Sequence, residues 1–219
     1  MTTGNTDYLQ ATPFVDSSDP AIQAFARQAI GKAHAAKDKA IALYAAVRDS
    51  IQYDPYVDFQ DPGVFRASSV LNAGKGFCVG KSAVLAAAAR ASGIPARPGY
   101  ADVRNHLTSK RLMETVGDTF YWHSYTELNI DDKWVKCTPA FDATLCARAN
   151  IAPLEFDGVH DSLFHPFDRT GRRHMEYLKD RGAFAEVPFE TILSDFKKFY
   201  PKLLGASPPA ANFRDEVTT

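Results

Sequence analysis

The first half of the chain carries hydrophobic residues at helical spacing. Asp19 and Pro20 supply an N-cap followed by a proline at the first helical position, and apolar residues then recur every three or four positions to about residue 35. This pattern predicts an amphipathic helix. We expect Asp38 to cap a second helix. The buried side of this second helix is predicted to carry Ile41, Leu43, Tyr44, Val47 and Ile51.

An alanine-rich run follows an irregular segment. Residues 53–63 are rich in Asp and Pro and are typical of a loop, and residues 68–72 predict a short helical turn before a bend at Gly74. A longer helix is predicted over residues 79–91, because alanine has the highest helix propensity, and Gly93 is expected to end it. Cys78 therefore stands at the N-terminus of this helix.

Beyond Gly93 the pattern changes to that of strands. Residues 120–128 are rich in aromatic and β-branched side chains, residues 129–133 form a polar turn, and residues 134–138 resume the strand pattern. These three segments predict an antiparallel hairpin. Residues 97–103 are expected to add a third strand, with a polar excursion over residues 105–118 between them.

Helical spacing returns near the C-terminus, at residues 175–179 and 189–200. Residues 206–219 are expected to form a flexible tail. The chain has 219 residues of which 45% are hydrophobic, which is enough for one core, so we predict that residues 1–205 form a single domain. Helices followed by an antiparallel sheet indicate an α+β fold.

Composition and charge exclude several classes of function. The formal net charge is -1 and the charged residues of both signs are interspersed, so we expect no nucleic-acid partner. The N-terminal residues lack a signal-peptide pattern and no later segment is long and apolar enough for a membrane span, which predicts a cytoplasmic protein without a membrane partner. Three cysteines fit a reducing compartment, and neither cysteines nor histidines have metal-ligand spacing, so neither a metal nor another cofactor is expected.

Cys78 is the first candidate for chemistry. Unpaired backbone N–H groups and the positive end of the helix dipole favour a thiolate at a helix N-terminus, and Lys75 and Lys81 are expected to act in the same direction. A cysteine in an intracellular protein is otherwise most often a small buried hydrophobic residue.

His123 is the second candidate, because it lies on the first strand of the predicted hairpin. A single histidine on a strand is usually a structural or surface residue. Together with a cysteine at a helix N-terminus, however, it supplies the base of a thiol–imidazole pair, which also needs a third group to hold the ring.

Four short motifs occur in a definite order: GKGFC at residues 74–78, GIPAR at 93–97, HSYTEL at 123–128 and KWVK at 133–136. Over about residues 40–142 the chain therefore resembles the transglutaminase-like superfamily of cysteine enzymes. The resemblance implies a papain-like core, in which N-terminal helices with the nucleophile at a helix N-terminus pack on an antiparallel sheet. It implies that Cys78 is the nucleophile, that His123 is the base and that an Asp orients the histidine. Residues 143–205 would be a C-terminal extension of the same domain.

The third member departs from the family pattern. The family's Asp usually precedes a proline a few residues after the strand Trp, and Thr138 occupies that position here, before Pro139. A threonine hydroxyl can accept a hydrogen bond from the ring but cannot stabilise an imidazolium as a carboxylate does. Asp142 lies just beyond and could substitute. Thr138, Asp142 or neither of them could therefore orient His123.

An acyl-transfer site also needs hydrogen-bond donors for the developing oxyanion. The Cys78 backbone N–H is one candidate, and Gln52 is a candidate side-chain donor, since papain-like enzymes use an upstream Gln. Residues 153–162 gather acids and a histidine without a calcium-loop pattern, and we expect them to pack beside the hairpin.

These features predict a cysteine-dependent acyl-transfer enzyme. We expect it to hydrolyse a peptide or other amide bond through a Cys78 thioester, with a peptide, a protein or a small amide or acyl compound as substrate. Transfer of the acyl group to an amine is one alternative. A binding or scaffold protein that keeps the fold with weakened catalysis is another, because Thr138 replaces the Asp. The sequence leaves the oligomeric state open.

Overall fold

The computed structural model describes residues 6–106, 109–164, 167, 169–171, 174–202 and 213–217. Its helical elements are η1 (Asp7–Leu9), α1 (Pro20–Ile30), α2 (Ala36–Ser50), η2 (Pro62–Phe65), α3 (Ala67–Ala73), α4 (Cys78–Ala91), α5 (Lys110–Val116), α6 (Ala143–Arg148), α7 (Phe189–Phe199) and α8 (Phe213–Glu216). Its strands are β1 (Gln52–Tyr53), β2 (Lys75–Gly76), β3 (Ala96–Asn105), β4 (Thr119–Ile130), β5 (Lys133–Cys137) and β6 (Met175–Ala183). No helix among these residues combines the length and apolar character needed to cross a membrane.

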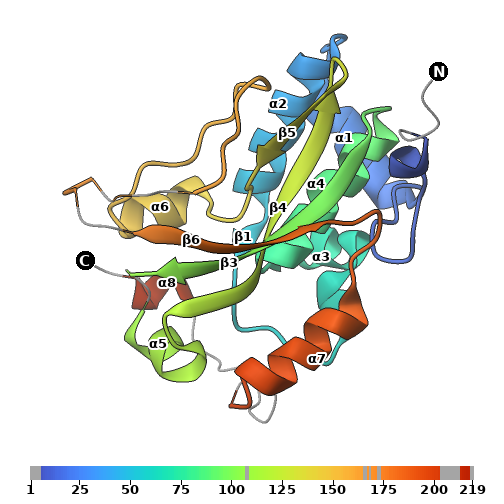
Figure 1. Cartoon of the computed structure of the whole chain (residues 1–219). Helices are drawn as coiled ribbons and strands as arrows, with labels where there is room; N and C mark the ends of the chain where they lie inside the picture. The colour runs from blue at the N-terminus through green and yellow to red at the C-terminus, as the bar shows by residue number, and fades with distance from the viewer. Residues whose placement is uncertain are drawn as a thin grey trace.

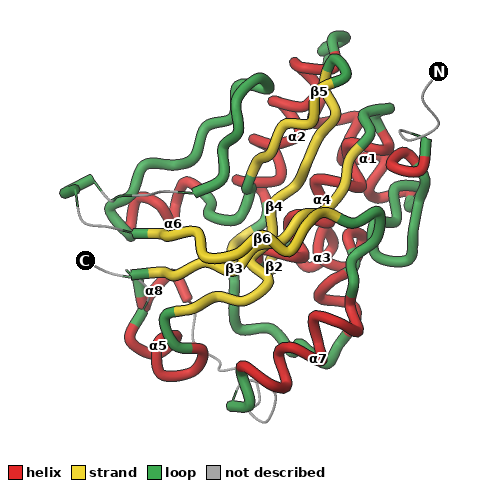
Figure 2. The backbone as a smooth tube through the Cα atoms, viewed as in Figure 1, coloured by secondary structure: helices red, strands yellow, loops and turns green. Residues whose placement is uncertain are grey.

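The main sheet, whose strands are yellow in Figure 2, has four strands in the order β5-β4-β3-β6. Every neighbouring pair is antiparallel. β4 and β5 form the predicted hairpin, whose turn residues Asp131 and Asp132 have φ angles of 50° and 63°. The short strands β1 and β2 pair in parallel, with Tyr53 opposite Gly76. This pairing brings the end of α2 next to the turn that precedes Cys78.

The helices α1 to α4 form a layer against one side of the sheet, and α4 lies in its centre (Figure 1). Residues 78–90 of α4 are all buried. Small side chains allow the neighbours to approach this helix closely: a Cβ added at Gly80 would lie 2.6 Å from the Val64 carbonyl oxygen. The alanine-rich sequence therefore makes α4 the central helix of the core, and Cys78 at its start faces the sheet.

The elements that follow β3 close the other end of the sheet. α5, α7 and α8 lie on its lower side in Figure 1, and α7 packs against β4. Ring stacking joins the two, because the rings of Tyr121 on β4 and Phe199 on α7 lie 4.0 Å apart and nearly parallel. The C-terminal region is thus part of the structure around β4.

Most predicted elements are present, with shifted ends. Asp19 caps α1, as expected, through bonds from Ala21 N–H and Ile22 N–H. Asp38 is not the cap of α2; the helix begins at Ala36, so Asp38 lies in its first turn. The polar excursion over residues 105–118 contains α5, which Ser109 caps.

Two predictions near the C-terminus need correction. Residues 175–179 are not helical but belong to β6, which pairs with β3 at the edge of the sheet. Several consecutive side chains of β6 are exposed, so its sequence lacks the alternation of polar and apolar residues that would identify a strand. The expected tail, residues 206–219, includes α8, whose Phe213 is buried; its other residues, except Val217, lie outside the described part of the chain.

Candidate active site

Cys78 is the first residue of α4, and its side chain is buried with 8% exposed. Burial raises the pKa of the Cys78 thiol to about 11, although the backbone N–H groups of Ser124, Val79 and Cys78 itself favour the thiolate. The helix N-terminus therefore supplies donors to the sulfur, as predicted, but the apolar surroundings outweigh them. The resting thiol is neutral at pH 7.

Lys75 and Lys81 do not assist the thiol as expected. The Lys75 ammonium pairs with Asp54 at 3.0 Å. Lys81 is fully buried and donates to the Arg48 and Ile51 carbonyl oxygens at the end of α2, at 2.9 and 2.5 Å. Burial also lowers the pKa of Lys81 to about 7. Each ammonium group is held by acceptors other than Cys78.

His123 on β4 faces the same cavity as Cys78. The histidine is 3% exposed, and burial lowers its pKa to about 4, with the nearby charge of His174 acting in the same direction. His174 is a second buried histidine that the sequence analysis did not single out. The imidazole is consequently neutral and able to accept a proton.

The cavity between these two side chains has a volume of about 60 Å³. Aromatic and aliphatic residues from six parts of the chain form the rest of its wall. They include Tyr53, Phe59, Phe77, Leu112, Phe120, Tyr121, Trp122, Phe196 and Tyr200. No Asp, Glu, Lys or Arg is among the described residues that line it. An ion pair formed here would be poorly solvated, which explains why both partners are neutral at rest.

Thr138 shares a second, smaller cavity with His123, and Cys78 is not among the described residues that line it. Leu154, Phe164 and Met175 also line it. The Thr138 hydroxyl is buried and has no hydrogen-bond partner among the described residues. The structure thus brings Thr138 and His123 together and leaves the hydroxyl with an unused hydrogen-bonding capacity.

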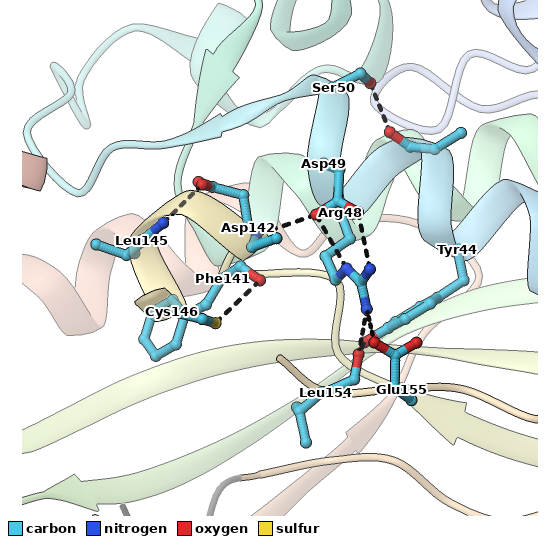
Figure 3. A network of polar contacts seen from close by, with 12 residues as sticks. Tyr44, Arg48, Asp49, Ser50, Phe141, Asp142, Leu145, Cys146, Leu154 and Glu155 are labelled. Atoms are coloured by element: carbon cyan, nitrogen blue, oxygen red, sulfur yellow. Dashed lines mark hydrogen bonds and ion pairs between the residues drawn. The ribbon is translucent and has the colours of Figure 1, made fainter. Parts of the chain in front are cut away.

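Asp142 caps the start of α6, and Figure 3 shows the hydrogen bond that its carboxylate accepts from Leu145 N–H. Oδ1 accepts from Leu145 N–H at 2.9 Å and from Arg214 Nη2 at 2.8 Å. Oδ2 accepts from Tyr53 N–H at 3.1 Å. Asp142 therefore joins α6, β1 and α8, and none of these bonds involves His123.

Gln52 is the first residue of β1, and it is not among the described residues that line the cavity with Cys78. Its neighbour Tyr53 lines that cavity, because successive strand residues point to opposite faces. Burial holds the pKa of Tyr53 well above its ordinary value, and a negative charge on Cys78, when the thiolate forms, adds to the effect. Tyr53, and not its predicted neighbour Gln52, is thus the β1 residue at this cavity.

Trp122, which directly precedes His123, has a backbone conformation that the sequence did not indicate. Its φ angle is 60°, a left-handed conformation that costs a non-glycine residue roughly 1–3 kcal/mol. β3 and β4 change register there, between the pairs Ala101–His123 and Val103–Phe120. This β-bulge depends on contacts between distant segments, so no local sequence signal could have identified it.

Residues 153–162 pack beside the hairpin, as predicted. Ser162 accepts from Thr138 N–H at 2.9 Å and donates its own N–H to the Lys136 carbonyl at 2.8 Å. Leu154 accepts a bond from the Tyr44 hydroxyl at 2.9 Å, near the start of the same segment. The segment thereby supports the end of β5, where Thr138 follows.

Comparison with known proteins agrees with this architecture. The family model described as the transglutaminase-like superfamily core matches residues 23–139. No curated protein matches the chain.

Among solved structures, a proposed cysteine protease from Cytophaga hutchinsonii is similar over 81% of this chain, with 15% identity and a TM-score of 0.51. This chain spans 64% of the length of that protein. A proposed protease from Parabacteroides distasonis has 17% identity over 60% of this chain and 24% of its own, with a TM-score of 0.40. A structure described as a TGase has 23% identity over 57% of this chain and 32% of its own, with a TM-score of 0.39.

The family match covers more than half of the 219 residues and includes both Cys78 and His123. The TM-score of 0.51 with the first of these structures indicates a shared fold. The chain therefore belongs to the transglutaminase-like superfamily.

Proposed function

We propose that this protein is a cysteine-dependent acyl-transfer enzyme that hydrolyses an amide bond through a Cys78 thioester. The observation that carries the proposal is that Cys78, at the start of α4, and His123, on β4, line one apolar cavity. A nucleophile and a base that meet in a cavity of this kind are the minimum that nucleophilic catalysis requires.

In the first half of the reaction, the Cys78 sulfur attacks the amide carbonyl while His123 takes the thiol proton. The C–N bond then breaks, and His123 gives this proton to the leaving amine, which leaves a thioester on Cys78. In the second half, His123 takes a proton from water as the water oxygen attacks the thioester. The carboxylic acid is released and the proton returns to the sulfur.

The apolar wall determines when charge appears in the site. Burial favours the neutral thiol and the neutral imidazole, so the thiolate and imidazolium form during attack and not in the resting protein. The Cys78 backbone N–H and the Tyr53 hydroxyl are the proposed donors for the oxyanion, with Tyr53 in the role first assigned to Gln52.

Thr138 is the proposed orienting group for the histidine. Its buried hydroxyl has no partner among the described residues and shares a cavity with His123, whereas the Asp142 carboxylate already accepts three hydrogen bonds. An acceptor on the far side of the ring fixes the tautomer whose other nitrogen can take the thiol proton. A hydroxyl stabilises the imidazolium form of His123 less than a carboxylate would, so we expect a modest rate of catalysis.

The substrate is proposed to be a peptide, a protein or a small amide whose acyl part is apolar next to the scissile bond. The uncharged wall around Cys78 and His123 supports this choice, because a charged group would lose its hydration there without gaining a partner. Three free cysteines also support a location in a reducing compartment such as the cytoplasm.

Acylation by an activated ester tests the proposal. p-Nitrophenyl hexanoate should add a hexanoyl group to Cys78, detected by intact-mass spectrometry, and the adduct should decay as water hydrolyses it. Cys78→Ala should give no adduct at this position. Formation of hexanoyl-cadaverine when cadaverine is added would identify transfer to an amine. An untouched Cys78 in the parent protein would favour the binding or scaffold alternative, which the raised pKa of Cys78 and the threonine at position 138 also favour.

A further inference from the structure

The β-bulge that precedes His123 places two backbone N–H groups of β4 out of register with β3. Between the pairs Val103–Phe120 and Ala101–His123, β4 has two residues where β3 has only Asp102. Side chains satisfy both groups. Tyr121 N–H donates to the Tyr200 hydroxyl at 2.6 Å, and Trp122 N–H donates to Asp102 Oδ1 at 3.2 Å. Both N–H groups of the irregular backbone are therefore hydrogen-bonded.

The Trp122 indole is held separately. Its Nε1–H donates to Asp195 Oδ2 on α7 at 2.7 Å. The Arg181 guanidinium lies over the indole, with its central carbon 4.5 Å from the ring centroid. The Trp122 residue is 4% exposed, so these contacts are made inside the protein.

Arg181 connects the two carboxylates that contact Trp122. Its Nε donates to Asp102 Oδ1 at 2.5 Å and its Nη1 donates to Asp195 Oδ2 at 2.8 Å. The arginine is also out of register in its own strand, because β6 pairs Gly182 with Tyr100 and Asp180 with Ala101. A second bulge on β6 thus directs Arg181 across β3 towards the first one.

We propose that Asp102, Arg181 and Asp195 form a clamp that holds Trp122 in its left-handed conformation and thereby positions His123 against Cys78. The three residues come from β3, β6 and α7, and they hold the backbone N–H, the ring face and the ring N–H of Trp122. They are positioning residues, since they act on His123 through its neighbour. The catalytic consequence of the clamp rests on the proposed function of Cys78 and His123.

The geometry of a strand explains why the clamp matters for His123. A bulge shifts the register by one residue, and a shift by one residue moves every following side chain to the other face of the sheet. If Trp122 relaxed to an ordinary strand conformation, β4 would lose this shift. The His123 ring would then no longer keep its place in the wall shared with Cys78.

The chain offers a matched control for the clamp. Arg97 on β3 also donates through Nε to a carboxylate, Glu127 Oε2 at 2.7 Å, and also lies over a tryptophan, 4.2 Å from a Trp134 ring centroid. Arg181→Met and Arg97→Met therefore remove the same kinds of contact, but only the first acts next to His123. Arg181→Lys keeps the charge over the ring and loses the two-sided hydrogen bonding.

The direct readout is the His123 ring signal in NMR, assigned by its loss in His123→Gln. In the parent and in Arg97→Met this signal should not titrate between pH 5 and pH 8. In Arg181→Met it should titrate in that range, with Arg181→Lys intermediate. If the His123 signal of Arg181→Met has the position and titration of the Arg97→Met signal, the clamp does not position the histidine and the proposal is overturned.

Acylation by p-nitrophenyl hexanoate gives the second readout, measured well below the unfolding temperature of every variant. The rate of Cys78 acylation should fall at least tenfold in Arg181→Met and less than twofold in Arg97→Met. An equal fall in the acylation rate of both variants would overturn the proposal that the clamp assists catalysis. Absence of acylation in the parent would contradict the proposed function instead, while the NMR comparison would still decide whether the clamp holds His123.

Discussion

The two candidate catalytic side chains differ in state from what the sequence indicated. The position of Cys78 at a helix N-terminus is correctly predicted. The prediction that the helix favours a thiolate fails, because the protonation state of Cys78 depends on the surroundings of the sulfur as well as on the helix. Burial raises the pKa of Cys78 to about 11 and lowers that of His123 to about 4. Residues far apart in the sequence, such as Phe59, Trp122 and Phe196, form the apolar wall around the two side chains. A local sequence pattern therefore cannot predict this wall.

Burial of neutral His123 predicts a specific loss of stability in acid. The folded-state pKa of His123 lies below that of an unfolded histidine, so the stabilisation is complete above about pH 6.5 and is lost as the pH falls towards 4. Between pH 7 and pH 4 the parent should lose about 3 kcal/mol more than His123→Gln. Urea unfolding of both proteins at several pH values measures the difference, and parallel curves would contradict the assignment.

Thr138 provides a prediction in which stability and activity change in opposite directions. Thr138→Val replaces an unpaired buried hydroxyl by a methyl group of similar size, so the free energy of unfolding should stay the same or rise by about 1 kcal/mol. The rate of Cys78 acylation should fall about tenfold if the hydroxyl orients His123. Thr138→Ser, which keeps the hydroxyl, is the control. An unchanged acylation rate in Thr138→Val would mean that Thr138 has no such role.

At the scale of helices and strands, the sequence predicts best those segments whose residues favour the same secondary structure from one end to the other. α4 is predicted nearly to its ends, because alanine favours helix at every position and Gly93 follows its end. β6 is missed because it lies at the edge of the sheet with polar side chains exposed, so that pairing with β3 decides its structure. The bulge at Trp122 is missed for a related reason, since its hydrogen bonds come from β3 and from the C-terminal region.

Gly80 tests the close packing of α4. Gly80→Ala would place a methyl carbon 2.6 Å from the Val64 carbonyl oxygen and 2.8 Å from Val70 Cγ2. Such overpacking should lower the free energy of unfolding by about 1–3 kcal/mol. Thermal or urea unfolding measures the effect. Ser50→Ala, at the exposed end of α2, is the control. Gly31→Ala is unsuitable, because Gly31 has a positive φ angle that an alanine would not adopt without strain.

A substitution at Asp142 tests whether its carboxylate has a structural or a catalytic role. Asp142→Asn removes the charge that faces Arg214 and should destabilise the contact between α6, β1 and α8 by about 1–3 kcal/mol. Acylation of Cys78, measured well below the unfolding temperature, should change less than threefold. A loss of a hundredfold or more, with the fold intact, would instead make Asp142 the group that orients His123.

At the scale of the whole molecule, the site extends beyond the part of the chain that carries the family motifs. Residues 23–139 match the family and supply Cys78, His123 and Thr138. Phe196 on α7 and Tyr200 just beyond it complete the cavity wall, and Arg181 and Asp195 hold Trp122. No sequence motif marks this region, so the sequence predicted only an extension of the domain there. Its contribution follows from α7 packing against β4, a contact that only the folded chain establishes.

The central claim is that Cys78 is a nucleophile activated by His123 in this cavity. The most direct test is the rate at which p-nitrophenyl hexanoate acylates Cys78 at pH 7 in the parent and in His123→Ala, with Cys78→Ala as the blank. Neither Cys137 nor Cys146 lines the cavity that Cys78 shares with His123, so acylation of these two thiols should not depend on His123, and peptide mapping separates their adducts from that of Cys78. We predict an adduct at Cys78 that forms at least a hundredfold more slowly without His123. Equal rates in the parent and in His123→Ala would contradict it.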